Sequence, residues 1–281
     1  MHKKILVTGS RGFIGKHLVK ALKEHGHTVT EFDLVLGNDV TKPIEGDYDI
    51  IYHLAAYSLI KTRDNPWKAI DVNIKGTLNV LELARKCDAK VIFSSASSVY
   101  GIPLYKRVIE TNPIRPVSVY GMTKASAETL IETYYRLYGI DYLIFRFTNV
   151  YGPMQTFGVI PSFINAINEG NPIVIFGSGK QTRDFVFVDD VVHFLVRAIE
   201  EDKKNMKLNL GSGKTISIKE LAELCIKIAG RRCEIINRPV ERDERWGFSA
   251  DLTSLKEVFN EVPETSLEEG LKKTFERWST T

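Results

Sequence analysis

The chain has 281 residues, of which 43% are hydrophobic and 26% are charged, and its formal net charge is +3. This composition predicts a globular α/β protein of one large domain or one domain with a smaller lobe, and the scattered basic residues argue against a nucleic-acid partner. No apolar run approaches the roughly 20 residues that a membrane helix needs, and MHKKILVTGS enters a strand at once, so we expect a cytoplasmic protein with no membrane segment and no signal peptide. Cys87, Cys225 and Cys233 form no C-x-x-C pair, which favours buried thiols over a disulfide framework or a metal site.

Strands and helices alternate in the first half of the chain. The predicted strands are KILVTG, TVTEFD, YDIIYHLAA, KVIFSS and DYLIFRF. The predicted helices are FIGKHLVKALKEHG, the segment from Trp67 to Cys87 and the segment from Ser118 to Tyr138. In the second helix we expect a buried stripe of Ile70, Ile74, Leu78, Leu81 and Leu83. This alternation predicts βαβ crossovers and a parallel sheet covered on both faces.

The pattern changes after Gly152, because three prolines break the chain into shorter pieces. The predicted helices of this half are VVHFLVRAI, IKELAELCIKIA and LEEGLKKTFERW, and the predicted strands are PIVIFG, FVFV and KLNLG. We expect residues 1–152 to form the first domain, to which later segments return. Residues 153–281 are expected to form mainly a smaller lobe.

A glycine-rich turn follows the first strand. Gly9, Gly12 and Gly15 stand at G-x-x-G-x-x-G spacing before the first helix, whose N-terminus presents free N–H groups to a phosphate. Asp33 ends the second strand 18 positions after Gly15, near the roughly 20 expected for a ribose contact. The combination predicts a dinucleotide site. A carboxylate there repels a 2′-phosphate and favours NAD, although Arg11 inside the loop leaves NADP open.

Tyr120 and Lys124 lie four residues apart in the predicted helix from Ser118, so they share one face. A phenol titrates near about 10; a neighbouring ammonium lowers that pKa, and an oxidised nicotinamide would add to the effect. The pair therefore predicts a base that removes a hydroxyl proton as hydride leaves the same carbon. Tyr-x-x-x-Lys alone is common, and an exposed Tyr and Lys on an amphipathic helix is the structural alternative.

Further motifs carry a family resemblance over nearly the whole chain. They are NDV, HLAA, VNIKGT, SSASSVYG, RFTNVYGP, GKQTRDFVFVDD and LNLGSG. With the glycine loop and Tyr-x-x-x-Lys, the sequence resembles extended short-chain dehydrogenases/reductases of the NAD-dependent epimerase/dehydratase family, and most of all UDP-glucose 4-epimerases. The resemblance implies a Rossmann-type doubly wound parallel sheet, a C-terminal α/β substrate lobe, bound NAD and a nucleotide-sugar substrate of the UDP-hexose kind. It also implies a homodimer through the helices near residues 67–86 and 118–138.

The resemblance assigns roles to single residues. It implies that the cofactor contacts are Gly9, Gly12, Phe13, Ile14, Gly15, Asp33, Asp39, Val40, Leu54, Ala55, Ala56, Asn73, Ser94, Tyr120, Lys124 and Phe147. It implies that the substrate contacts are Asn149, Val159, Phe176, Arg183 and Arg242. Arg183 is suited to clamp a diphosphate, and an ion pair with Asp184 or Asp189 is its structural alternative.

One position departs from the family pattern. Ala96 stands where a serine or threonine usually hydrogen-bonds the reacting hydroxyl. Ser98 is the first candidate to replace it if the strand end is extended, and Ser97 is the candidate if the backbone turns there. The structural alternative is that both serines only satisfy backbone groups of the turn. These serines also stand where related dehydratases carry an Asp-Glu pair, which disfavours dehydration.

The motif set predicts an NAD-dependent nucleotide-sugar 4-epimerase of the UDP-glucose/UDP-galactose type. A nucleotide-sugar reductase or dehydrogenase would use the same parts and release its cofactor each turnover. A non-catalytic NAD-binding sensor is the third alternative, and Ala96 is the observation that favours it.

Overall fold

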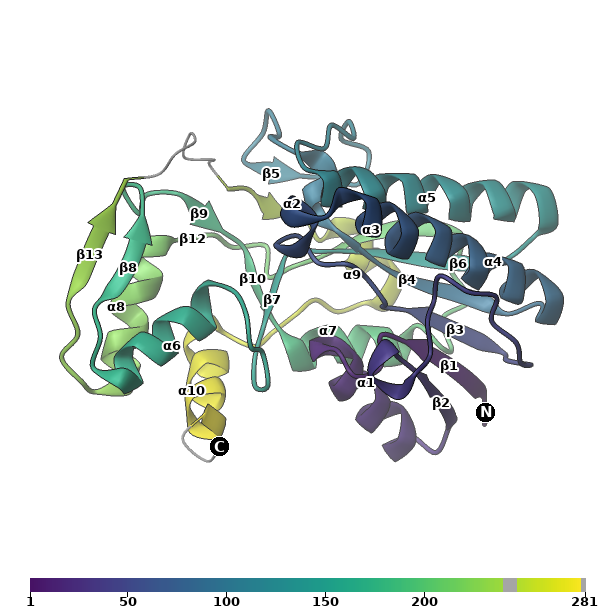
Figure 1. The fold of residues 1–281 in the computed structure, drawn as a ribbon, viewed down its shortest axis with the longest axis horizontal. Coiled ribbons are helices and arrows are strands. Elements are labelled where there is room, and N and C mark those ends of the chain that lie inside the picture. Colours follow the sequence, from purple (N-terminus) through teal and green to yellow (C-terminus); the bar gives the residue numbers. More distant parts are fainter. Residues whose placement is uncertain (240–246, 279–281) are drawn as a thin grey trace.

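The computed structural model describes residues 1–239 and 247–278, and its centre is a six-stranded parallel sheet. The strands run in the order β11 (Met206–Leu210), β6 (Tyr142–Phe147), β4 (Lys90–Ala96), β3 (Ile50–His53), β1 (Lys4–Thr8) and β2 (Thr28–Phe32) (Figure 1). Every pairing within it is parallel. The central strands β3 and β6 are buried along their whole length because both faces of the sheet are covered. The predicted doubly wound parallel sheet is thereby confirmed.

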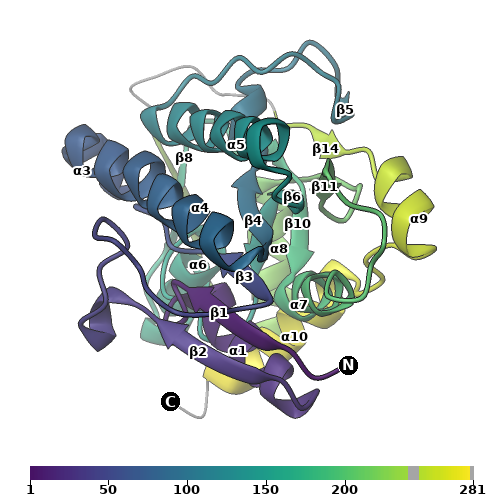
Figure 2. The ribbon, with the colours of Figure 1, turned by 90° about the vertical axis from the view of Figure 1, so that its right-hand side faces the viewer.

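Helices cover both faces of this sheet (Figure 2). On one face, α1 (Phe13–Glu24), α7 (Val188–Arg197) and α9 (Thr253–Phe259) pack against alternate strand residues such as Ile5 and Val7. On the other face, α4 (Gly76–Cys87) and α5 (Val119–Tyr138) pack against the intervening residues, among them Leu6. This division follows from the two-residue period of a strand, which sends neighbouring side chains to opposite faces.

The predicted helix from Trp67 to Cys87 is interrupted. It consists of α3 (Pro66–Ile70), the π-helical segment η2 (Asp71–Lys75) and α4. The predicted stripe is wrong at Ile70 and Leu78, which are 37% and 38% exposed, whereas Leu81 and Leu83 are buried. A π turn adds a residue to the helical repeat and shifts the phase of the buried face. The residues that face the protein here are largely small or polar: Ala69, Asn73, Gly76, Thr77, Val80 and Ala84.

A smaller lobe is built beyond the carboxyl ends of the strands (Figure 1). In it, β8 (Ile173–Phe176) pairs in parallel with β13 (Ile235–Arg238), and α6 (Val159–Glu169), α8 (Ile218–Ala229) and α10 (Leu267–Trp278) share a separate core. Short strands join the lobe to the sheet: β7 (Asn149–Tyr151) with β10 (Phe185–Phe187), β9 (Thr182–Arg183) with β12 (Ile216–Ser217), and β5 (Arg107–Val108) with β14 (Ser249–Ala250). Because β11 and α7 return to the main sheet, the chain passes between the two parts more than once.

The start of α5 is fixed locally. Ser118 caps the helix, and its side chain accepts a hydrogen bond from the N–H of Gly121. Gly139, at φ 75°, ends the helix in the left-handed conformation that glycine adopts without steric cost. Tyr120 therefore lies in the first turn of α5, next to the carboxyl ends of the strands. Within residues 1–239 and 247–278, no helix is both long and apolar enough to cross a membrane.

Candidate active site

The glycine loop forms a turn that no larger residue could line. A Cβ on Gly9, whose φ is +69°, would lie 2.6 Å from the backbone nitrogen of Ala55, and one on Gly15 would lie 2.2 Å from the carbonyl oxygen of Gly9. Gly12 precedes α1, and no side chain caps the first turn of that helix. Open N–H groups at a helix N-terminus, approached by bare backbone, fit the pyrophosphate of a dinucleotide.

Asp33 lies beside this loop, at the end of β2. Its carboxylate accepts hydrogen bonds from the N–H of Arg11 at 2.9 Å and from that of Val35 at 3.0 Å. Arg11 itself points to another carboxylate, because its Nε lies 3.1 Å from Glu31 Oε2. A guanidinium held in that ion pair is a poor partner for a 2′-phosphate, so the geometry favours NAD over NADP.

The other predicted cofactor residues lie along the carboxyl edge of the sheet with different degrees of exposure. Asp39 accepts a hydrogen bond from the N–H of Thr41, which lowers the pKa of its carboxyl. Val40 is buried against Gly76 at the start of α4. Partly buried are Phe13, Ile14, Leu54 and Ala55; Ala56 is exposed and Phe147 is buried.

Asn73 connects three segments. Its side-chain oxygen accepts a hydrogen bond from the N–H of Tyr57 at 2.7 Å. Its side-chain N–H groups donate to the carbonyl of Tyr57 and to Thr123 Oγ1 on α5. Asn73 is 2% exposed, so these bonds are shielded from water. The π-helical turn thus fixes the loop after HLAA against the helix that carries Tyr120 and Lys124.

Tyr120 and Lys124 do not form the exposed helix surface that was their structural alternative. Lys124 is 2% exposed, and its Nζ donates to the carbonyl oxygen of Ser94 at 2.7 Å. The same Nζ lies 4.6 Å from the ring centre of Phe93 and 5.8 Å from that of Tyr120. Tyr120 is partly buried. The two side chains therefore converge at the carboxyl end of β4, at the edge of the sheet where the cofactor is predicted to bind.

Burial dominates the titration of this pair. It lowers the pKa of Lys124 to about 7, against the opposing influence of Glu128, and it raises the pKa of Tyr120 to about 12. The expectation that the neighbouring ammonium lowers the phenol's pKa is wrong for the protein without ligand, because burial disfavours the charged phenolate and raises that pKa. An oxidised nicotinamide bound beside Tyr120 would supply positive charge that favours the phenolate.

The segment Ser94–Tyr100, which we call the serine turn, changes conformation at Ser97. Strand β4 ends at Ala96, and Ser97–Tyr100 is a 3-10 helix, η3. Ser98 was preferred on the assumption that the backbone stays extended beyond Ala96, and it does not. The backbone turns at Ser97 instead, which is the case in which Ser97 was expected to replace the missing hydroxyl. However, Ser98 Oγ is buried and has no hydrogen-bond partner within the described part of the chain. Both serines therefore stay candidates for the hydroxyl that Ala96 lacks.

The other hydroxyls of the serine turn are already used. Ser94 Oγ donates to the carbonyl of His53 at 3.1 Å, and Ser95 Oγ donates to Glu128 at 2.5 Å. The serine turn offers no carboxylic acid. It consequently lacks the acid/base pair that elimination of water from a sugar would need.

The predicted substrate residues lie on the side of the smaller lobe. Asn149 on β7 donates its side-chain N–H to the carbonyl of Asp184 at 2.8 Å. Arg183 on β9 donates to the carbonyl of Thr182 at 2.7 Å. Val159 begins α6, and Phe176 ends β8 with 58% of its surface exposed. Arg242 lies outside the described residues.

Asp184 organises the loops around Arg183. Its buried carboxylate accepts from the N–H groups of Ser212, Gly213 and Ala250 and from the hydroxyl of Ser212. Burial raises the pKa of this carboxyl even against those hydrogen bonds. The carboxylate thus serves to join three backbone segments between the sheet and the lobe.

Sequence reasoning missed His53. The imidazole is fully buried and hydrogen-bonds Thr8 Oγ1 at 2.8 Å and Thr77 Oγ1 at 3.0 Å. Burial, with the charge of Lys124 as a second cause, lowers the pKa of His53 to about 3, so it is neutral at physiological pH. Thr8 in turn accepts from the N–H of Ala55. His53 therefore links β3 to α4 and to the end of β1, where the glycine loop begins. In the sequence, the position of His53 in the HLAA motif was the one sign of this role.

Sequence reasoning also missed Glu128 and Arg146, which form a buried ion pair behind Lys124. The available signal was the position of Glu128 four residues after Lys124, on the same helix face. Among residues 1–239 and 247–278, no group of three or more His, Cys, Asp or Glu side chains is arranged to hold a metal ion.

Comparisons with known proteins agree with this geometry. Among curated relatives, a Methanocaldococcus jannaschii protein provisionally named UDP-glucose 4-epimerase is 38% identical, with 96% of each chain covered. UDP-glucuronic acid decarboxylase 2 of Arabidopsis thaliana is 34% identical over 95% of this chain and 66% of its own length.

Solved structures match along almost the whole chain. UDP-glucose 4-epimerase of Thermotoga maritima, solved with UDP-glucose, has a TM-score of 0.91 and 33% identity, with 99% of each chain covered. UDP-glucuronic acid 4-epimerase of Bacillus cereus, solved with UDP-glucuronic acid and NAD, has a TM-score of 0.90 and 30% identity, again with 99% of each chain covered. A model of the NAD-dependent epimerase/dehydratase family matches residues 5–211. The chain belongs to the NAD-dependent epimerase/dehydratase family, as a nucleotide-sugar enzyme that uses NAD.

Proposed function

We propose that the protein interconverts UDP-glucose and UDP-galactose by transient oxidation of the sugar at C4. The observation that carries the proposal is the convergence of Tyr120 and buried Lys124 on the serine turn, which holds no carboxylic acid and one hydroxyl without a partner among the described residues. Proton abstraction and return suffice for epimerisation, whereas elimination needs a further acid.

Tyr120 acts as the base. Its phenolate would take the proton of the sugar 4-OH, and NAD held by the glycine loop and Asp33 would supply the acceptor for the C4 hydride, so that a 4-keto sugar forms. Tyr120 would return the proton as the hydride returns to the opposite face of the sugar, which gives the epimer without net oxidation. The ammonium of Lys124 stabilises the phenolate electrostatically, in a site from which the protein excludes most water.

Ser98 and Ser97 supply the hydrogen bond that Ala96 lacks. The hydroxyl of Ser98 is the stronger candidate, because it is buried and unpaired in the described structure. A donor aimed at the position where charge develops contributes a few kcal/mol to the transition state.

The UDP moiety of the substrate lies toward the smaller lobe in this proposal. Arg183 pairs with the diphosphate, and Asn149, Val159 and Phe176 line the nucleotide side, with Arg242 as a further cation for phosphate. The exposure of Phe176, 58%, suits a ring that stacks or packs on a ligand. The glycine loop, Asp33, Asp39, Val40, the HLAA residues, Asn73, Ser94 and Phe147 contact NAD.

Decarboxylation of UDP-glucuronic acid is the second candidate, because a plant decarboxylase is 34% identical to this chain. Loss of carbon dioxide from a 4-keto uronate leaves an enolate that must be protonated at C5. The serine turn carries no carboxylic acid for that step, which favours the epimerase. A reductase differs by releasing its cofactor, so NAD that stays with the protein through purification argues against a reductase.

We also propose that two copies of the chain associate through α4 and α5. The outer faces of these helices expose several large apolar side chains: Leu78, Tyr135, Leu137 and Tyr138. Size-exclusion chromatography with light scattering measures the molar mass in solution, which we expect to be that of a dimer. A Leu78→Glu variant that stays dimeric would argue against this interface.

A panel of UDP-, GDP- and dTDP-sugars, with products resolved by chromatography, tests the reaction. We expect UDP-galactose from UDP-glucose, and UDP-galacturonate rather than carbon dioxide if UDP-glucuronate is accepted. Absence of a C4 epimer from every donor would refute the proposal. Tyr120→Phe should lose nearly all of the rate, since it removes the proton acceptor and leaves the ring in place.

A further inference from the structure

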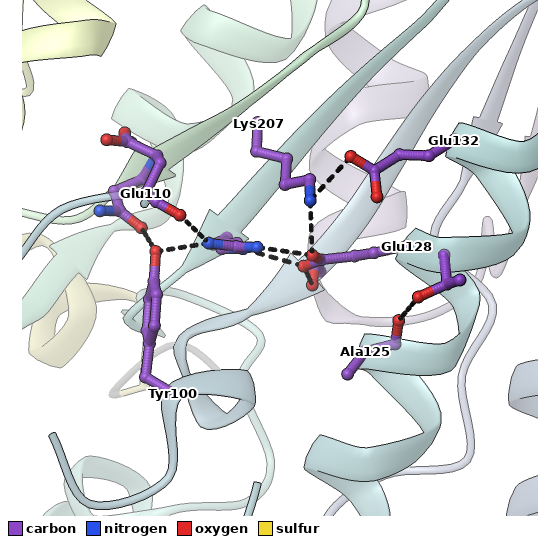
Figure 3. Close-up of polar contacts among 10 residues, drawn as sticks. Tyr100, Glu110, Ala125, Glu128, Glu132 and Lys207 are labelled. Carbon is purple, nitrogen blue, oxygen red and sulfur yellow. Dashed lines mark hydrogen bonds and ion pairs between the residues drawn. The ribbon is translucent and has the colours of Figure 1, made fainter. Parts of the chain in front are cut away.

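A buried ion pair lies behind the Tyr120–Lys124 pair. Arg146, on β6, donates through Nε to Glu128 Oε1 at 3.0 Å and through Nη2 to Glu128 Oε2 at 2.7 Å. Both side chains are 1% exposed. Two parallel hydrogen bonds fix direction as well as distance. The pair therefore holds α5 and β6 in one relative orientation (Figure 3).

The same ion pair is attached to both ends of the serine turn. At the first end, Ser95 Oγ donates to Glu128 at 2.5 Å, next to the carbonyl that accepts from Lys124. At the other end, Tyr100 accepts a hydrogen bond from Arg146 Nη1 at 2.8 Å, and the guanidinium carbon lies 4.9 Å from the tyrosine ring centre. The two serines proposed to meet the substrate lie between these attachments.

The hydrogen-bond network continues into β11, the edge strand of the sheet. Tyr100 donates to Asn209 Oδ1 at 2.7 Å, and the backbone N–H of Asn209 donates to Glu110 Oε1 at 2.7 Å. Ser254, on α9, donates to Glu110 Oε2 at 3.1 Å. The buried members of this network, Tyr100 and Asn209, resist displacement because breaking their hydrogen bond would strand polar groups away from water.

In the part of the chain that the structure describes, few charged groups reach Lys124. The groups that face it are Tyr120 and Glu128 of α5, His53 of β3, and the ring of Phe93 and carbonyl of Ser94 on β4. The groups that face Glu128 are Arg146 of β6, Ser95 of β4 and Lys207 of β11, the last at 4.0 Å. His53 is neutral at working pH, so the carboxylate of Glu128 is the charge that favours the ammonium form of Lys124.

We propose that Glu128 and Arg146 are positioning residues for the Tyr120–Lys124 pair. They fix the serine turn against α5, and Glu128 keeps a negative charge one helical turn from Lys124. The inference rests on the proposed function for its rate measurement, but not for its geometry or for the charge state of Lys124.

Two variants separate the positioning role of the ion pair from the effect of the Glu128 charge, and a third variant serves as the control. Arg146→Lys keeps the positive charge and loses the second hydrogen bond, so we expect kcat to fall by up to about a hundredfold with the alkaline limb of the pH profile unchanged. Glu128→Gln/Arg146→Met removes both charges together, which avoids an unpaired buried ion. For this double variant we expect the same loss of kcat and an alkaline limb at lower pH, because Lys124 loses its proton earlier without Glu128.

Glu132→Gln is the matched control. It makes the same charge change on the same face of α5, one turn further from Lys124, where Glu132 pairs with Lys207 at 2.8 Å. We expect its kcat and pH profile to equal those of the parent protein. The inference is overturned if Arg146→Lys and the double variant keep the parent kcat and alkaline limb, or if the control shows equal losses.

A measurement without sugar substrate tests the charge directly. In protein labelled with ¹³C-lysine, the side-chain resonance that disappears in Lys124→Met reports the titration of Lys124 by NMR. We expect this titration at lower pH in the double variant than in the parent protein, and an unchanged titration overturns the electrostatic part. A shifted titration in a protein that epimerises no donor would refute the proposed function alone.

Discussion

Asp33 is the residue at which the preference for NAD can be tested most directly. Its Oδ2 accepts from the N–H of Arg11 and its Oδ1 from the N–H of Val35, which holds the carboxylate beside the glycine loop. Each carboxylate oxygen retains a lone pair for a ribose hydroxyl. Asp33→Asn leaves one acceptor oxygen for both backbone N–H groups, so we predict weaker NAD binding.

The size of the effect follows from the bonds that are lost. A hydrogen bond to a charged group contributes about 1.5–3 kcal/mol, and about 1.4 kcal/mol changes a dissociation constant tenfold. We therefore expect the Kd for NAD to rise by about 10- to 150-fold. Isothermal titration calorimetry on cofactor-free protein measures it, with thermal melting as the control for folding. A rise below about threefold, which is about 0.6 kcal/mol, would refute the assignment of Asp33 to the ribose.

Glu31 provides the second half of this test. Its carboxylate pairs with Arg11 at 3.1 Å and with Lys23 at 2.7 Å. We predict that Glu31→Gln/Asp33→Asn binds NADP more tightly than Asp33→Asn alone, because Arg11 is released toward the 2′-phosphate. Equal NADP affinity of the two variants would show that the Arg11–Glu31 pair does not set cofactor choice.

Three further predictions concern the serines of the candidate active site, the glycine loop and the buried histidine. Ser98→Ala should lower kcat by about 10²–10³ and Ser97→Ala by far less; the opposite ranking in steady-state kinetics assigns the hydrogen bond to Ser97. Gly15→Ala should destabilise the protein by about 1–3 kcal/mol, measured by urea unfolding, because its Cβ would lie 2.2 Å from a backbone oxygen that cannot move away cheaply. Because the pKa of His53 is about 3 when folded and about 6.5 when unfolded, the unfolded chain binds the extra proton between these values. The free energy of unfolding should therefore decrease as the pH is lowered below about 6.5, by up to about 1.4 kcal/mol per pH unit. Urea unfolding at pH 7 and pH 5 measures this decrease, and the contribution of His53 to it should be absent in His53→Gln.

The sheet was predictable because its central strands are buried on both faces. KILVTG, IIYH and YLIFRF have few polar residues, and the glycine of KILVTG marks the end of the first of these strands. The glycine loop was equally predictable from the sequence. Backbone that approaches a phosphate closely leaves no room for side chains, and this requirement produces the glycine spacing. Both signals are local, so neither depends on knowing which distant segment lies next to them.

The parts that sequence reasoning missed depend on distant contacts. The π turn at Asp71–Lys75 is fixed by Asn73, whose partners lie in the loop after HLAA and on α5. The turn at Ser97 and the pairing of Glu128 with Arg146 similarly join segments that the chain separates widely. The ionisation of Tyr120 was misjudged because desolvation is set by the whole surrounding core, of which a helix pattern reveals one face.

The return of β11 to the outer side of β6 has a consequence for synthesis on the ribosome. All six residues of β6 are buried in the finished protein, yet the strand that protects its edge, Met206–Leu210, emerges only after much of the smaller lobe. Until then the nascent sheet displays an apolar strand with unpaired backbone groups, a form of surface that invites wrong pairing between chains. The interleaving that places the lobe against the sheet therefore also sets the period during which a growing chain most needs protection from aggregation.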